Sequence, residues 1–151
     1  MKGVLIFFGL LLLAACGDDG AAKDYLKIAG GGITYNYRYS QAGMTVIAQQ
    51  KYPFPAGSSV EAQFDLPGQN KRETVSLPAM EGKLTYKLQS GAITGLKKGG
   101  EYNVTIRLLD NAGKELDRED TKFTSDQDQD LLPDKPIVSG LEFTPQLENL
   151  K

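Results

Sequence analysis

The chain offers few side chains that could catalyse a reaction. Among its 151 residues there is one cysteine, Cys16, and no histidine. A serine or cysteine nucleophile needs a neighbouring base, and histidine is the usual one, so the common nucleophile–histidine arrangements are excluded. A zinc site would have to use carboxylates alone, which is unusual. We therefore expect no enzymatic activity and no cofactor.

Carboxylates close together in sequence are the remaining chemical option. The stretch ELDREDT contains Asp117, Glu119 and Asp120, interleaved with Arg118 and Lys122. Two converging carboxylates would suit a hydrolase. A solvated edge strand explains the same pattern, because charges on an edge discourage strand-to-strand aggregation. We favour the edge strand and keep the hydrolase as an alternative.

A second acidic run, SDQDQDLLPDKP, has carboxylates at alternate positions. They are Asp126, Asp128 and Asp130, followed by Asp134. Alternating carboxylates can converge on a calcium ion, and the run resembles the D-x-D-x-D-x-x-P-D calcium repeats of some extracellular proteins. Those repeats have glycine where Leu131 stands, and leucine resists the turn that glycine allows. We favour an acidic linker and keep calcium binding as an alternative.

Tyrosines alternate in the stretch ITYNYRYS. As a strand, it places Ile33, Tyr35, Tyr37 and Tyr39 on one face. If exposed, these rings could stack on a carbohydrate or dock a peptide; if buried, they form the core face of an early strand. We favour the core.

The first residues resemble an export signal. One cation, Lys2, precedes the apolar run VLIFFGLLLLAA. As a helix this run is roughly 18 Å long, too short for a bilayer core of about 30 Å. A charged start, a short apolar run and small residues are typical of a cleaved secretory signal peptide; the alternative is a buried helix.

The end of that run carries a more specific motif. Leu13-Ala14-Ala15-Cys16 resembles the bacterial lipobox. The resemblance implies cleavage before Cys16, a diacylglycerol on its sulfur and an acyl group such as palmitate on its new N-terminus. Two or more acyl chains give stable anchoring. A lone cysteine cannot form an intramolecular disulfide. Gly17, rather than an aspartate, follows the cysteine, which in enteric bacteria favours the outer membrane over the inner one.

Between Tyr25 and Thr124 the hydrophobic pattern has a period of two, typical of half-buried strands. Turn residues separate about seven such runs, in residues 33–40, 44–50, 59–67, 72–78, 83–88, 102–110 and 114–124. Many short strands with turns between them indicate an all-β sandwich or barrel.

The stretch TGLKKGGEYNVTI resembles the last core strands of fibronectin type III domains. The resemblance rests on Leu96, on the glycine turn, on Tyr102 six residues after the leucine, and on Val104 and Ile106. It implies a tyrosine corner, in which Tyr102 packs at the edge of the sandwich beside Leu96 and its hydroxyl bonds upstream backbone. The tryptophan usual in that family is absent. We predict an immunoglobulin/fibronectin III-like antiparallel β-sandwich; the alternative is a generic β-hairpin protein.

The predicted organisation has four parts. They are a signal peptide (1–15), an acylated tether (16–24), the β-sandwich (25–124), and an acidic linker with a C-terminal tail (125–151). The tail is apolar in places and could pack back on the sandwich or add a strand to a partner.

Charge bears on possible partners. The formal charge is −2 without a basic cluster, so we expect no nucleic-acid binding. We expect a lipoprotein that is held in the membrane through Cys16 and acts as a non-enzymatic binding or scaffolding module, whose candidate partners are other envelope proteins. The alternative is a calcium- or carbohydrate-binding surface protein.

Overall fold

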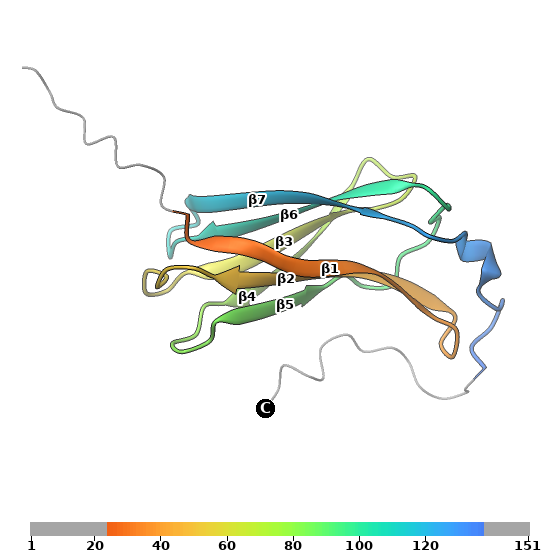
Figure 1. Ribbon diagram of the computed structural model, residues 1–151, viewed down its shortest axis with the longest axis horizontal. Helices are drawn as coiled ribbons and strands as arrows, with labels where there is room; N and C mark the ends of the chain where they lie inside the picture. The colour runs from red at the N-terminus through yellow and green to blue at the C-terminus, as the bar shows by residue number, and fades with distance from the viewer. Residues whose placement is uncertain (1–23, 138–151) are drawn as a thin grey trace, which may run out of the picture.

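The computed structural model describes residues 24–137, which form seven β-strands and one 3-10 helix. They are β1 (Leu26–Asn36), β2 (Gln41–Gln50), β3 (Ser59–Asp65), β4 (Arg72–Pro78), β5 (Thr85–Gln89), β6 (Glu101–Leu109), β7 (Glu115–Thr124) and η1 (Gln129–Leu131). One antiparallel sheet has the order β1-β2-β5 and the other β4-β3-β6-β7, and the two lie face to face (Figure 1). This arrangement confirms the predicted all-β sandwich, and it is compatible with the immunoglobulin and fibronectin III architecture.

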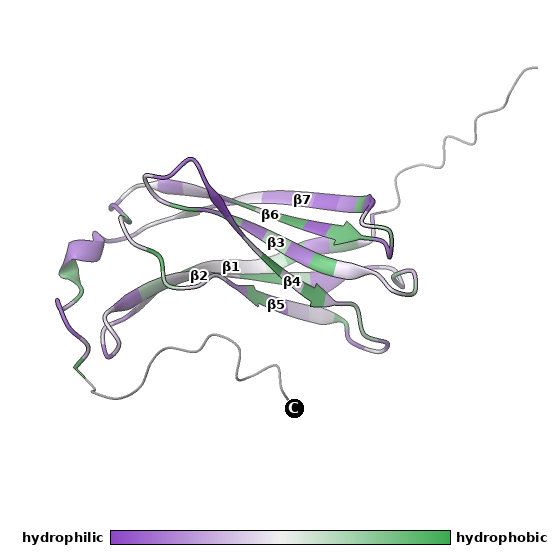
Figure 2. Ribbon diagram, turned by 180° about the vertical axis from the view of Figure 1, so that it is seen from behind, coloured by the Kyte–Doolittle hydropathy of each residue, from purple (hydrophilic) through white to green (hydrophobic). Residues whose placement is uncertain are grey.

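The core forms from side chains that alternate along the strands, because successive residues of a strand point to opposite faces. Along β6, Val104, Ile106 and Leu108 are fully buried, as the period-two pattern predicts. Strand β2 contributes Met44 and Val46, which are also fully buried. Figure 2 shows hydrophobic and hydrophilic residues alternating along β3 and β6, whereas β7 at the sheet edge is mostly hydrophilic.

The first strand differs from its prediction. We predicted that this strand continues through Ser40, and that prediction is wrong. Strand β1 ends at Asn36, and residues 37–40 form the turn into β2. The side chain of Asn36 accepts a hydrogen bond from the backbone N–H of Tyr39 (3.3 Å), and Ser40 has φ +52°. Asparagine favours such turns because its side chain can replace a backbone acceptor. The tyrosine stripe is therefore broken: Tyr35 is half-buried in β1, while Tyr37 is 43% exposed in the turn.

A second difference concerns the strand predicted at 83–88. We expected Leu84, Tyr86 and Leu88 to share a core face, and the last two are fully buried. Leu84 precedes the first residue of β5 and is 61% exposed. The prediction that Leu84 lies in the core was wrong, because this residue belongs to the loop before β5, where the alternation of the strand does not hold.

The sandwich has two distinct ends (Figure 1). The start of β1 lies at one end together with the β2–β3 loop (residues 51–58) and the β4–β5 loop (residues 79–84), and Asp24 pairs with Lys51 of the first loop; we call this the N-terminal end. The opposite end carries the β1–β2 turn and the segment 125–137 with η1; we call it the cap end.

Candidate binding surfaces

The predicted lipid site lies outside the described residues. The predicted signal peptide, the predicted lipobox with Cys16 and the predicted tether up to residue 23 all precede the described range. Within residues 24–137, no helix is long and apolar enough to cross a bilayer.

The residues of the predicted tyrosine corner lie together at the start of β6. Leu96 is fully buried, and the hydroxyl of Tyr102 accepts a hydrogen bond from the backbone N–H of Lys97 (2.9 Å). Gly100 fits closely under the ring: a Cβ at this position would lie 2.6 Å from the tyrosine hydroxyl oxygen and 2.9 Å from the Lys97 carbonyl oxygen. These distances leave no room for a side chain, so close packing against Tyr102 explains why residue 100 is a glycine.

The segment after β7 is packed on the sandwich through Gln129. Its side-chain oxygen accepts a hydrogen bond from the backbone N–H of Leu96 (3.1 Å), and its amide nitrogen donates to the carbonyl of Ile93 (2.8 Å). Its own backbone N–H donates to the Leu96 carbonyl (3.1 Å). Leu132, just after η1, is 9% exposed. The part of the predicted acidic linker up to residue 137 thus closes one end of the sandwich, and we call residues 125–137 the cap segment.

Two tyrosines of the first strand and turn hold the cap segment from the other side. The Tyr35 hydroxyl bonds the side chain of Ser125 (2.5 Å) and donates to the carbonyl of Gln127 (3.0 Å). Burial raises the pKa of Tyr35. The exposed Tyr37 donates to the side-chain oxygen of Gln127 (2.9 Å). These rings therefore have structural partners. The polar residues Ser125, Gln127 and Gln129 were not singled out from the sequence, where they stand between aspartates without a pattern of their own.

The acidic side chains of the cap segment bind the turn before β6. An oxygen of Asp128 accepts a hydrogen bond from the backbone N–H of Lys98 (3.0 Å), and Asp130 forms an ion pair with the ammonium of Lys97 (3.0 Å). The hydrogen bond with Asp130 raises the pKa of Lys97. Among residues 24–137, no three acidic, cysteine or histidine side chains are grouped to hold a metal ion. The calcium candidates Asp126, Asp128, Asp130 and Asp134 are thus not gathered into a cation site.

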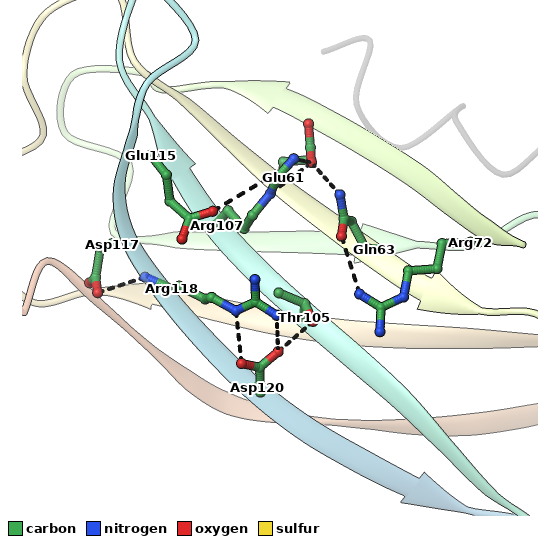
Figure 3. A network of polar contacts seen from close by, with 9 residues as sticks. All are labelled: Glu61, Gln63, Arg72, Thr105, Arg107, Glu115, Asp117, Arg118 and Asp120. Carbon is green, nitrogen blue, oxygen red and sulfur yellow. Dashed lines mark hydrogen bonds and ion pairs between the residues drawn. The ribbon is translucent and has the colours of Figure 1, made fainter.

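The outer face of the β3-β6-β7 region carries a network of charges (Figure 3). Glu61 on β3 accepts hydrogen bonds from Arg107 on β6, one of them 3.1 Å from the guanidinium Nε. The Glu61 side chain is 11% exposed and that of Arg107 is 25% exposed, so this pair is shielded from water. The hydrogen bond with Glu61 raises the pKa of Arg107, which also reaches Glu115 on β7 (3.4 Å).

The carboxylates considered for a hydrolase belong to different surroundings. Asp120 accepts hydrogen bonds from Arg118 (2.9 Å) and from the Thr105 hydroxyl (2.5 Å), which hold the pKa of Asp120 below its ordinary value. Asp117 instead accepts a bond from the backbone N–H of Leu26 (2.9 Å), and it thereby links β7 to the start of β1. Glu119 is half-buried opposite Ile106 in the register. Asp120 thus pairs with a cation, and Asp117 with a backbone N–H group. Such partners give both carboxylates a structural role, as expected of a charged edge strand.

Each end of the sandwich also has a hollow. A polar one of about 500 Å³ lies between the β3–β4 loop and the start of β6, with Asp65, Arg72, Glu101 and Tyr102 among its lining residues. A more apolar one of about 540 Å³ lies between the β2–β3 and β4–β5 loops at the N-terminal end. Concave apolar surfaces of this size suit a ligand or a partner surface.

The fold and these hollows define the class of protein. It is an antiparallel β-sandwich whose loops form a hollow at each end. No protein-family model matches the sequence. No curated protein matches it either.

Proposed function

We propose that this protein is a lipid-anchored lipoprotein of a bacterial cell envelope, whose β-sandwich is a non-enzymatic binding or scaffolding module. The observation that carries the proposal is the motif Leu13-Ala14-Ala15-Cys16 at the end of a short apolar run that begins with Lys2. Lipids on Cys16 would fix the chain to a membrane, since two or more acyl chains anchor stably. Gly17 supports the outer membrane as the location.

The polar face supports a binding or scaffolding role over catalysis. A catalytic carboxylate needs a perturbed proton affinity and access to substrate. Glu61 and Asp120 are instead paired with Arg107 and Arg118, and the hydrogen bonds to Asp120 lower the pKa of that carboxyl. Pairs of this kind rigidify a sheet and leave the loops at its ends to contact other molecules.

Mass spectrometry of the native protein, purified from envelopes, tests the anchor. We expect residues 1–15 to be absent and Cys16 to carry a diacylglycerol and an acyl group. The Cys16→Ser variant should lose the lipid and leave the membrane fraction. An intact residue 1–15 segment with an unmodified Cys16 thiol would contradict the proposal.

A comparison of two chains tests the binding role. The acylated full chain and a chain ending at Ile137 are used to capture envelope proteins. Ending at residue 137 keeps Gln129 and Leu132, which pack on the sandwich, so any partner lost is lost with the tail. Partners retained by both chains would bind the sandwich itself. If neither chain captures anything above beads that carry no protein, the scaffolding role fails.

A further inference from the structure

Exposed apolar side chains gather at the N-terminal end of the sandwich. Tyr52 in the β2–β3 loop is 48% exposed, and Met80 and Leu84 in the β4–β5 loop are 58% and 61% exposed. The hollow of about 540 Å³ between these loops includes further apolar residues in its wall, namely Pro53, Phe54, Pro55 and Ala79. Large side chains exposed together on a soluble domain usually mark an interaction surface.

This apolar end lies next to the point where the described chain begins. The carbonyl of Tyr25 accepts hydrogen bonds from the backbone N–H groups of Lys51 (2.7 Å) and Tyr52 (3.3 Å). Gln50, which precedes Lys51, donates its backbone N–H to the carbonyl of Leu84 (2.9 Å). Two backbone hydrogen bonds therefore connect Tyr25 to the start of the β2–β3 loop, whose later residues line the hollow.

The length of the preceding segment limits how far this end can be from the lipid. Seven residues lie between Cys16 and Asp24, so eight Cα-to-Cα steps join the two. Fully extended, they span at most about 28 Å. Strand β1, with 11 residues, is about 36 Å long. A chain anchored at Cys16 thus keeps the N-terminal end within about 28 Å of the lipid, whereas the cap end can lie about 36 Å farther away.

The charges at this end are balanced. Asp24 and Lys51 form an ion pair, and Lys83 lies 5.1 Å from the centre of the Tyr86 ring, with Glu81 two positions before it. A surface with balanced charge and exposed apolar rings and aliphatic chains suits the interfacial layer of a bilayer, which binds by apolar burial. A polybasic surface would instead depend on anionic lipid.

We infer that the β2–β3 and β4–β5 loops dock on the surface of the same membrane that holds the lipid, with Met80, Leu84 and Tyr52 in contact with lipid. The inference rests on the proposed anchor at Cys16. Tethering gives the loops a high effective concentration at the bilayer, so a contact that is weak by itself suffices. Docking sets the orientation of the sandwich: the cap end and its polar hollow face away from the membrane.

A single-thiol labelling experiment on the full-length processed protein tests this orientation. Because the native chain has one cysteine, which the anchor would occupy, an introduced cysteine is the only free thiol. A fluorophore is placed at Met80→Cys or, as the matched control, at Leu131→Cys, which replaces a 63% exposed leucine at the cap end. Each protein is reconstituted in phosphatidylethanolamine–phosphatidylglycerol vesicles with and without brominated acyl chains.

We expect brominated lipid to quench the label at position 80 and to leave the label at position 131 unquenched. Adding Leu84→Asp should abolish most of the quenching at position 80 while the protein stays on the vesicles. Its thermal unfolding should stay close to that of the parent, because the Leu84 side chain is exposed. Quenching should persist in high salt and in phosphatidylcholine vesicles, since the charges are balanced.

Each adverse outcome has a separate meaning. Mass spectrometry of the same sample shows whether Cys16 is lipidated, and a free thiol there would defeat the proposed anchor. A lipidated, vesicle-bound protein whose label at position 80 is no more quenched than that at position 131 would overturn the docking inference and leave the anchor standing. Protection of position 80 in detergent that increases with protein concentration would show that a second copy covers this surface, which also overturns the inference.

Discussion

At the scale of single residues, several carboxylates among the described residues have specific partners. Asp120 binds Arg118 and Thr105, and Asp128 accepts a bond from the backbone of Lys98. The hydrogen bonds to Asp120 lower its pKa and so stabilise the charged form of this carboxyl. This explains why acidic runs that look like chemical sites in the sequence serve as structural contacts in the fold.

Stability should depend on pH through Asp120. The pKa of this carboxyl lies below its ordinary value of 3.8, so its ion pair stabilises the fold above about pH 4, and the contribution is lost as pH falls through the lowered pKa. The Asp120 side chain is 59% exposed, so solvent screens the pair and its loss should cost no more than about 1 kcal/mol. Urea unfolding of wild type and Asp120→Asn should differ at neutral pH and converge in strong acid. A difference that stays constant with pH would show that the pair is not responsible.

Calcium should leave the melting temperature unchanged at millimolar concentration. A bound ion stabilises the folded state by mass action, and the partners of Asp128 and Asp130 are Lys98 and Lys97 instead. Calorimetry with calcium and with magnesium as the control measures this. A saturable rise in melting temperature that is specific for calcium would contradict the structural role of these carboxylates.

At the scale of elements, the cap segment acts as an extra layer at one end of the sandwich. Gln129 satisfies backbone groups of the stretch before β6, and Tyr35 of β1 holds Ser125 and Gln127. The segment therefore adds a connection between the two sheets at the cap end.

Gln129→Ala should lower the free energy of unfolding by about 2 kcal/mol, because two backbone groups lose their partners and each half-buried hydrogen bond contributes roughly 1 kcal/mol. Urea unfolding followed by tyrosine fluorescence measures the change. Asp134→Asn, in the same segment, is the control and should stay within about 0.5 kcal/mol of wild type. Equal effects of the two substitutions would mean that the segment does not depend on Gln129.

At the scale of the whole molecule, β1 closes over the edge strand β7 of the other sheet. Leu26 donates its backbone N–H to Asp117, and Gly31 lies against Phe123. A Cβ on Gly31 would lie 2.4 Å from the Thr45 carbonyl oxygen and 2.5 Å from the Phe123 ring. The two sheets can approach here only because this residue has no side chain.

Gly31→Ala should therefore destabilise the fold by about 3 kcal/mol, since overpacking and an unfavourable φ of +153° act together. Gly32→Ala is the matched control: a Cβ there meets no atom within 4 Å, and the change should be within about 1 kcal/mol of neutral. Urea unfolding of both variants provides the comparison. Similar losses in both would show that backbone entropy, not the contact with Phe123, explains the glycine.

The period-two pattern was sufficient to predict the sandwich and much of its core, because alternation along a strand is a local property. Val104, Ile106 and Leu108 followed from it directly, and Leu96 and Tyr102 from a short motif. The end of β1 did not follow, since tyrosines continue to alternate through the turn at residues 37–40. The anchor at Cys16 stays a prediction, because the described residues begin at Asp24.

Local pattern thus indicated many of the residues that face the core, and the predicted lipobox is likewise readable from neighbouring residues alone. Only the folded chain decided which distant groups meet: Gln129 with Leu96, Glu61 with Arg107, and Tyr52 with Tyr25. Contacts of this kind join segments tens of residues apart, and no spacing within either segment specifies its partner. They depend on how two sheets stack, which is settled by packing the whole core at once.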